Sequence, residues 1–235
     1  MVSAPSRLTG VTELMDRPHQ DPGSLRTTLE HLAWVNRWCG AERAVLRTLA
    51  PLRARVASPL RILDVATGYA DIPRAMARWA RRRGLALHIE ALDHHGQIAA
   101  LAAAACLGYP EIRIRAGDAL ALPYPDASFD VVTASLLLHH MEADAPIRLL
   151  RELHRVARRI VLVSDLRRGR WPFLVAWLAL HLVSRDPMIR HDGPMSVRRG
   201  FLPDELAVLA REAGWTRPRV TRHSFFRLTL VGVKA

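Results

Sequence analysis

Three aspartates carry the first signal of chemistry in this 235-residue sequence, because each lies at or just beyond the end of an apolar run. Asp64, Asp93 and Asp118 mark the ends of what we predict to be successive strands of a parallel sheet. The carboxyl ends of such strands line one crevice, where a carboxylate can accept hydrogen bonds from both hydroxyls of a ribose. Three carboxylates on one rim also suit a metal ion. Without a fourth close ligand, however, we predict an organic nucleoside ligand and no metal.

The segment from Arg61 to Pro73, R-I-L-D-V-A-T-G-Y-A-D-I-P, predicts a strand, a tight loop and the start of a helix. Gly68 gives the loop backbone freedom, while Ala66 and Ala70 keep its side chains small where the backbone approaches a ligand. A dinucleotide site requires the spacing G-x-G-x-x-G, whereas this loop has glycine at one position. The pattern therefore disfavours a nicotinamide-dependent dehydrogenase.

The order D64-x-A66-x-G68-x-A70 resembles the first motif of the class I S-adenosylmethionine-dependent methyltransferases, D/E-x-G-x-G-x-G. Two further stretches, G-D-A-L-A-L-P-Y-P-D-A-S-F-D-V-V at 117–132 and L-L-R-E-L-H-R-V at 149–156, resemble later motifs of that superfamily. The similarity is greatest to the small-molecule branch that includes the ubiquinone and menaquinone biosynthesis methyltransferases. It covers about residues 61–165 and departs from the motif at Ala66 and Ala70. S-adenosylmethionine is the cofactor that this resemblance implies.

The resemblance also implies roles for individual residues. Asp64 would hold the methionine amino group, and Gly68 with its neighbours Ala66 and Thr67 would pass beneath the amino-acid part of the cofactor. Asp93 would bind the ribose hydroxyls.

For the adenine end, the resemblance implies that His94 lies beside the ring and that Asp118 accepts from the adenine amino group. Ala119 would donate its backbone N–H, and Ser135 and Leu136 would lie near the sulfonium. We therefore expect the cofactor to contact residues from at least three strand ends.

Histidine is the side chain best matched to removing a hydroxyl proton at neutral pH. Methyl transfer itself depends on the alignment of acceptor, methyl and sulfur. His139 and His140 follow the fourth predicted strand, where a packing role competes with base catalysis. His191 lies in a predicted polar loop and is a candidate base or acceptor contact, and Asp165 is a further candidate polar contact.

Strands alternating with helices of about ten to fifteen residues predict an α/β fold with a doubly wound, mostly parallel sheet. The resemblance implies that this sheet is the seven-stranded one of the Rossmann-like methyltransferase fold. We divide the chain into an N-terminal arm and lid helices at 1–50 and a methyltransferase domain at 51–235. The arm, residues 1–23, is expected to be loosely ordered, and helices are expected at 24–40 and 41–49. Residues 166–200 are interpreted as an acceptor lid inserted in the domain, with a polar loop at 191–199.

The stretch 171–183 is apolar but, at about thirteen residues, too short to span a bilayer. Three interpretations stay open: the wall of a hydrophobic acceptor pocket, a peripheral membrane contact, or core. Trp171, Phe173 and Trp177 would suit a flat aromatic acceptor.

The net charge of +12 raises the question of nucleic-acid binding, but the basic residues are scattered arginines, with Lys234 the sole lysine. Two cysteines are too few for a disulfide framework. No secretory signal is evident, so we expect a cytoplasmic protein, as monomer or homodimer. The predicted function is methylation of a hydroxyl on a hydrophobic or aromatic small molecule such as a phenol, quinone precursor or polyketide. Alternatives are C- or N-methylation, RNA methylation, or a nucleoside-binding scaffold without activity.

Overall fold

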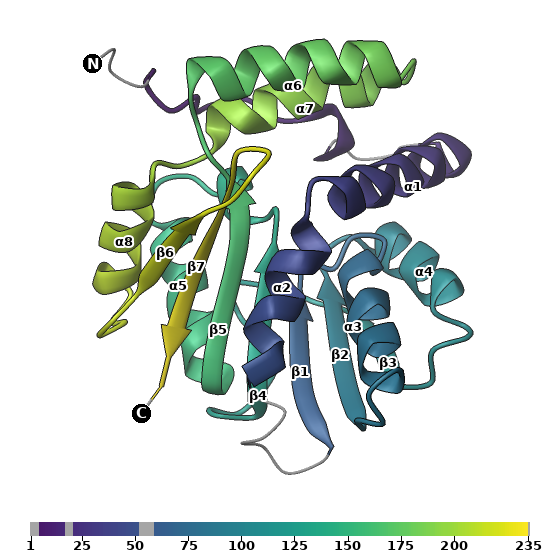
Figure 1. Ribbon diagram of the computed structural model, residues 1–235, viewed down its shortest axis with the longest axis vertical. Helices are drawn as coiled ribbons and strands as arrows, with labels where there is room; N and C mark the ends of the chain where they lie inside the picture. The colour runs from purple at the N-terminus through teal and green to yellow at the C-terminus, as the bar shows by residue number, and fades with distance from the viewer. Residues whose placement is uncertain (1–4, 17–20, 52–58, 235) are drawn as a thin grey trace.

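The computed structural model describes residues 5–16, 21–51 and 59–234, within which seven strands form a single sheet. The strands are β1 (Leu60–Val65), β2 (Leu87–Asp93), β3 (Ile112–Ala116), β4 (Phe129–Ser135), β5 (Ala157–Leu166), β6 (Arg219–Arg222) and β7 (Arg227–Val233). Their order across the sheet is β3-β2-β1-β4-β5-β7-β6, with β7 antiparallel to both neighbours and the other pairs parallel. The predicted doubly wound, mostly parallel sheet is confirmed (Figure 1).

The centre of the sheet is the point where the winding direction changes. From β1 the chain proceeds outward through β2 to β3, and it then returns to place β4 on the other side of β1. The register puts Asp64 of β1 level with Ala91 of β2 and Thr133 of β4. Because ligands of open α/β sheets bind outside the carboxyl ends of the strands at such a switch point, the ends of β1, β2 and β4 are where a site is expected.

Helices cover both faces of the sheet, and each face has its own apolar core. On one face α2 (Ala41–Leu49) and α3 (Asp71–Arg81) pack on Ile62 and Val131. On the other face α5 (Ala145–Val156) and α8 (Pro203–Glu212) pack on Leu63 and Val65. The alternation of buried side chains along β1 is what a strand covered on both faces requires, and it directs Asp64 to the α2 and α3 side.

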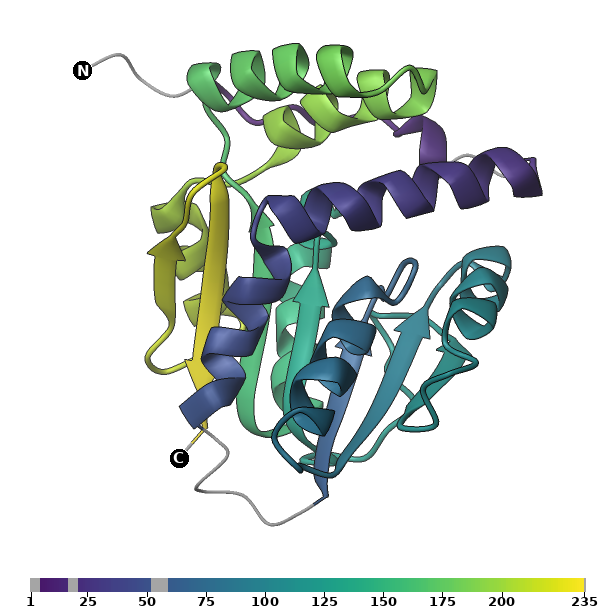
Figure 2. The same ribbon diagram turned by 45° about the vertical axis from the view of Figure 1, so that its right-hand side comes forward.

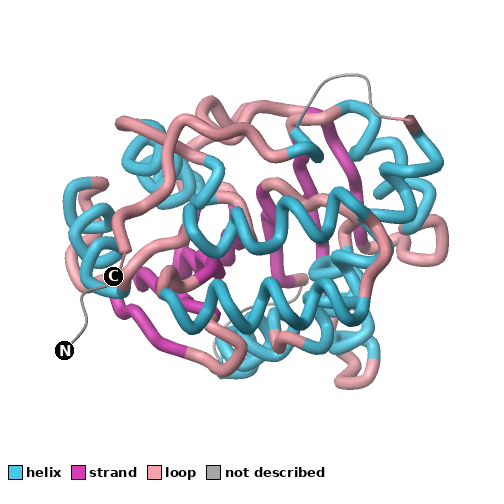
Figure 3. Tube along the Cα trace, turned by 90° about the horizontal axis from the view of Figure 1, so that it is seen from above, coloured by secondary structure: helices cyan, strands magenta, loops and turns pink. Residues whose placement is uncertain are grey.

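A second layer of helices crosses the carboxyl ends of the strands. It consists of α1 (Pro22–Trp38), α6 (Arg170–Val183) and α7 (Pro187–Arg199), with α4 (Gly96–Ala105) at the β3 edge. Figures 1 and 2 show α6 and α7 side by side above the sheet and α1 passing over the ends of the central strands. Viewed from above, these long helices lie over the strands (Figure 3). The carboxyl-end crevice is therefore roofed by helices.

Most element boundaries agree with the sequence pattern, but the expected polar loop at 191–199 is wrong. These residues belong to α7, whose start is capped by Asp186 accepting from Met188 N at 2.8 Å. Gly193 and Pro194 suggested a loop, yet both lie inside the helix. A Cβ at Gly193 would meet the Cδ1 methyl group of Leu180 on α6, which would then have to move aside. The glycine thus reflects close packing of two helices.

The described part of the N-terminal arm is not loosely ordered. Arg7 donates from Nε to the Arg199 carbonyl at 2.7 Å and from Nη2 to the Met141 carbonyl at 2.7 Å. The backbone N–H groups of Leu14 and Met15 donate to the two carboxylate oxygens of Asp192, each at 2.9 Å. These bonds hold residues 5–16, including the short 3₁₀ turn η1 (Leu14–Asp16), against α7 and the loop after β4.

Candidate active site

A cavity of about 650 Å³ lies between the carboxyl ends of β1, β2 and β4 and the roof of α1, α6 and α7. All ten residues predicted to bind the cofactor line it, together with two of the three candidate catalytic histidines. These residues are Asp64, Ala66, Thr67, Gly68, Asp93, His94, Asp118, Ala119, Ser135, Leu136, His139 and His140. The fold therefore gathers around one cavity the side chains that the sequence places on separate strand ends.

The loop after β1 has an unusual backbone. Ala66, Gly68 and Ala70 all have positive φ, at 55°, 54° and 54°, so every second residue is left-handed. Gly68 N donates to Asp93 Oδ2 at 2.9 Å, and Thr67 N donates to the Leu92 carbonyl at 3.0 Å, which folds the loop over the end of β2. Ala66 and Gly68 line the cavity, so a ligand would meet only small side chains and backbone there, whereas Ala70 packs in the core.

Replacing Ala66 by glycine is expected to stabilise the protein by about 0.5–1 kcal/mol, because an alanine side chain is strained at positive φ and glycine is not. Thermal denaturation of the apoprotein measures this. The control is Ala100→Gly on the exposed side of α4, where glycine is expected to destabilise by about 1 kcal/mol. A destabilised Ala66→Gly variant would show that the loop conformation is not strained.

Asp93 links the loop to the ribose position. Its Oδ2 accepts from Gly68 N and its Oδ1 accepts from His95 N at 3.0 Å, while burial raises the pKa of the carboxyl. Each carboxylate oxygen has a further lone pair. Asp93 can therefore order the loop and still accept from two ribose hydroxyls.

Asp64 is an almost fully buried acid, 2% exposed. Burial raises its pKa to about 7, and the nearby carboxyls of Asp71 and Asp93 act in the same direction. The Thr133 hydroxyl opposes this by donating to Asp64 Oδ1 at 2.6 Å. A buried acid of this kind is stabilised as the anion when a cation arrives, which is what a ligand ammonium group would provide.

The adenine end is more open. Asp118 and His94 are exposed, and Asp118 Oδ1 accepts from Leu120 N at 2.8 Å, whereas Ala119 is buried. At the end of β4, Ser135 Oγ is buried and has no hydrogen-bond partner in the described part of the chain. Leu136 follows with φ of 56°. A buried hydroxyl without a partner, aimed at a cavity, indicates a position that a ligand completes.

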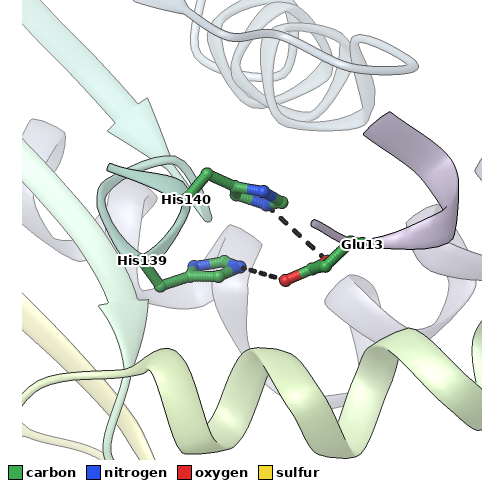
Figure 4. Close-up of side chains that lie close together, drawn as sticks. All are labelled: Glu13, His139 and His140. Atoms are coloured by element: carbon green, nitrogen blue, oxygen red, sulfur yellow. Dashed lines mark ion pairs between the residues drawn. The ribbon is translucent and has the colours of Figure 1, made fainter. Parts of the chain in front are cut away.

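The loop after β4 brings the predicted candidates His139, His140 and Asp165 together with Glu13, which the sequence analysis did not predict. His139 Nδ1 is 2.8 Å from Asp165 Oδ1, and the His139 backbone N–H donates to Asp165 Oδ2 at 3.1 Å. Glu13, from the N-terminal arm, lies with Oε1 3.8 Å from His139 Nε2 and Oε2 3.9 Å from His140 Nε2 (Figure 4). Burial opposes ionisation of Asp165, but His139 and the backbone N–H groups outweigh it and hold the pKa of this carboxyl below its usual range.

His191 does not join this group. It is exposed and lines a separate shallow hollow between α6 and α7, although its Nδ1 lies 2.8 Å from Asp192 Oδ1. Phe173 and Trp177 line the same hollow and Trp171 is 74% exposed, so none of these three aromatic side chains lines the cavity that holds the predicted cofactor residues. His191 lies outside the cavity because residues 191–199 form a helix, and this helix buries Asp192 while it exposes the neighbouring His191.

Glu13, Asn36 and Arg227 are among the polar cavity residues that the sequence analysis did not predict. Arg227 is 3% exposed and donates to Ser164 Oγ at 3.3 Å and to Asn36 Oδ1 at 3.2 Å, while burial lowers its pKa. Arg227 could not be singled out from the sequence because the chain contains many arginines.

The geometry defines a nucleoside-binding α/β fold with an acceptor region beside it. The chain belongs to the class I S-adenosylmethionine-dependent methyltransferases. Residues 62–159 match the family described as "Methyltransferase domain".

The chain is 33% identical over 168 residues to a demethylmenaquinone methyltransferase of Roseiflexus castenholzii, an alignment that covers 66% of this chain and 68% of the relative. It is 41% identical over 90 residues to the demethylmenaquinone methyltransferase of Deinococcus radiodurans, covering 38% of this chain and 36% of that one.

Solved structures share the fold at low sequence identity. A SAM-dependent methyltransferase from Aquifex aeolicus has a TM-score of 0.64 at 18% identity, with 92% of this chain and 100% of that chain covered. The magnesium protoporphyrin IX methyltransferase ChlM from Synechocystis PCC 6803, solved with bound SAH, has a TM-score of 0.56 at 16% identity, with 83% and 84% covered. These likenesses establish the fold.

S-adenosylmethionine is the cofactor of the family, and the residues present fit it. The buried Asp64 suits the methionine ammonium, Asp93 suits the ribose, and the left-handed loop from Ala66 to Ala70 leaves room for the chain between them. The unpartnered Ser135 Oγ marks the end of the cavity beside the histidines. The protein is thus a methyltransferase, and the open question is its acceptor.

Proposed function

We propose that this methyltransferase moves the methyl group of S-adenosylmethionine to a hydroxyl of a hydrophobic aromatic small molecule. In this reaction the acceptor oxygen loses its proton, attacks the methyl carbon and forms an O–C bond. The C–S bond breaks, its electron pair stays on sulfur, and S-adenosylhomocysteine leaves. Since sulfur is a good leaving group, alignment and removal of the proton are what the protein must supply.

The observation that carries the proposal is the group of Glu13, His139 and His140 at the end of β4, beside the position expected for the sulfonium. The Asp165 contact at His139 Nδ1 fixes the ring orientation and directs Nε2 towards the cavity side. A hydroxyl placed between Leu136 and these side chains would meet groups that favour loss of its proton.

The rest of the acceptor region is apolar, which supports a hydrophobic acceptor. Helices α6 and α7 contribute Val175, Ala179, Leu180 and Ile189 to the cavity wall. Apolar lining with few convergent polar groups is typical of small-molecule sites. The relatives named demethylmenaquinone methyltransferases point in the same direction, towards a quinone precursor or a phenol of similar shape.

Carbon methylation is the second candidate, since solved structures of the same fold include a DszA carbon methyltransferase. To separate the two, the purified enzyme is incubated with S-adenosylmethionine carrying a ¹³C-labelled methyl group and with a series of naphthoquinols and alkyl phenols. The label is then located by NMR. An O-methyl ether supports the proposal, while a methyl group bonded to ring carbon overturns it in favour of the second candidate.

The positive charge does not favour RNA as acceptor. Many arginines are held by acids within the fold: Arg81 lies 2.6 Å from Glu111, Arg155 lies 2.7 Å from Glu152, and Arg168 is 5% exposed and lies 2.6 Å from Glu205. Arginines that are paired in this way act as structural ties, which supports a small-molecule acceptor.

We also propose that α6 docks on an anionic lipid bilayer, from which a hydrophobic acceptor would enter. Apolar side chains on its outer face follow helical spacing and are between 48% and 76% exposed: Trp171, Leu174, Leu178 and Leu182. Residues 167–200 hold seven arginines, of which Arg168 and Arg199 are buried, leaving five; the two acids of this segment, Asp186 and Asp192, are engaged with Thr28 and with the N-terminal arm. An apolar stripe flanked by arginines fits a negatively charged membrane surface. Of the helices in residues 5–16, 21–51 and 59–234, none is long and apolar enough to cross a bilayer.

The double variant Leu178→Glu, Leu182→Glu is expected to bind vesicles of phosphatidylcholine and phosphatidylglycerol at least ~10-fold more weakly, because two leucines lose their lipid contact. Co-sedimentation measures binding. Val208→Glu on α8, also an exposed apolar position, is the matched control and is expected to bind like the native chain. Equal binding of all three proteins, or none by the native chain, would contradict docking through α6.

A further inference from the structure

We propose that Glu13, His139 and His140 form a binding site for a divalent transition-metal ion of the zinc type. One ligand atom from each residue lies within 4.8 Å of the others. The three side chains come from the N-terminal arm and from the loop after β4 (Figure 4). Two imidazoles and one carboxylate are a ligand set of catalytic zinc sites, which leave a further position for water or substrate.

The spacing of the ligand atoms suits such an ion. Tetrahedral ligands about 2.0–2.1 Å from zinc are roughly 3.3 Å apart. In the structure Glu13 Oε1 is 3.8 Å from His139 Nε2, and Glu13 Oε2 is 3.9 Å from His140 Nε2. These distances are too long for direct hydrogen bonds. With one ligand atom taken from each residue the three atoms lie within 4.8 Å of one another, so they would draw together by up to about 1.5 Å to surround a tetrahedral ion.

The surroundings already orient the ligands. Asp165 Oδ1 takes the Nδ1–H of His139 at 2.8 Å, so the Nε2 lone pair of a neutral ring points at Glu13. Ser196 Oγ donates to Glu13 Oε1 at 2.9 Å. Metal-binding histidines usually donate their other nitrogen to a carboxylate in this way. The structure therefore contains both the ligands and the outer contacts that hold them.

Burial gives the cluster a need for positive charge. The side chains of Glu13 and His139 are each 3% exposed, and that of His140 is 19% exposed. Glu13 therefore brings a negative charge into a nearly buried group, and a cation held between this carboxylate and the two imidazoles would neutralise it. Imidazole ligands favour zinc, cobalt or a similar ion over magnesium.

All three residues line the cavity, so a further ligand of the ion would come from the acceptor region. On the proposed function, the acceptor hydroxyl would take this position and release its proton to water, because a bound divalent ion lowers the pKa of a coordinated O–H. The resulting oxygen then takes the methyl group from sulfur as described above. The metal site itself does not depend on which acceptor is correct.

The test measures metal binding without any acceptor. The protein is treated with chelator, dialysed and titrated with Zn²⁺ by calorimetry, and separately with Co²⁺, whose visible absorption reports nitrogen and oxygen ligands. We expect one ion per chain, at least ~100-fold weaker binding in Glu13→Gln and in His140→Gln, and about 10–100-fold weaker binding in Asp165→Asn. His191→Ala, which removes a histidine outside the cluster, is expected to bind as the native chain does.

S-adenosylhomocysteine binding by each variant verifies the fold, since the cofactor contacts lie elsewhere in the cavity. Binding of no ion by the native chain, or unchanged binding in Glu13→Gln and His140→Gln, would overturn the metal site. Neither result would affect the proposed O-methylation, because the NMR assay tests the position of the transferred methyl group independently. A bound ion together with a C-methylated product would leave the metal site standing and overturn the acceptor.

Discussion

An Asp93→Ala variant should bind S-adenosylhomocysteine at least ~100-fold more weakly than the native enzyme. The carboxylate of Asp93 is placed to accept from two ribose hydroxyls, and a hydrogen bond to a charged group contributes about 1.5–3 kcal/mol. The same carboxylate holds Gly68 N and His95 N, so its removal also loosens the loop that lies beneath the cofactor. Both effects act in the same direction, and calorimetric titration of the apoprotein measures their sum.

Two further variants, Asp93→Asn and Asp126→Ala, are compared with Asp93→Ala in the same titration. Asp93→Asn keeps one acceptor oxygen and should fall between the native enzyme and Asp93→Ala. Asp126→Ala removes a carboxylate that is 79% exposed and remote from the cavity, and its affinity should equal the native value. Native-like affinity in a folded Asp93→Ala variant would mean that the nucleoside does not bind at the end of β2.

The cofactor end of the site was predictable from sequence because its signals are local. Asp64 and Asp93 each end an apolar strand, and the small loop residues Ala66 and Gly68 follow directly, so strand order alone brings them together. What the pattern did not show is that Ala66 is left-handed, since alanine rarely adopts that backbone. The cofactor roles of these residues stay predictions until affinities are measured.

The acceptor end was not predictable to the same degree, because it is built from distant segments. Glu13 comes from an arm that was expected to be loosely ordered. It is held near His139 because Arg7 donates to the His139 carbonyl and Leu14 N donates to Asp192, contacts that no local pattern encodes. His191, by contrast, was predicted from a local pattern but lies outside the cavity. A histidine next to an aspartate near glycine and proline is typical of a functional loop, but helix packing turned it outward.

Asp64→Asn is expected to raise the stability of the apoprotein at pH 8 while strongly weakening cofactor binding. The folded pKa of Asp64 is about 7, well above the usual value of an unfolded aspartate, about 3.9. Between these two pH values the folded state holds a proton that the unfolded state has lost, so the native protein loses stability as pH rises from about 4 to 7. By linkage this loss approaches about 4 kcal/mol at pH 8. Asparagine carries no such charge and can still accept from Thr133 Oγ1.

Denaturant unfolding of native and Asp64→Asn apoproteins at pH 4 and pH 8 measures this effect, and the gain should be present at pH 8 and absent at pH 4. Asp165→Asn provides the matched comparison, because Asp165 is equally buried but its pKa is lowered. Its ionised form stabilises the fold above the usual pKa of an aspartate, and that contribution is lost only in more acid solution. Asp165→Asn should therefore destabilise at pH 8. If both variants shift stability in the same direction at pH 8, the negative charge of Asp64 is already compensated in the apoprotein, and a cofactor ammonium is not needed to explain its burial.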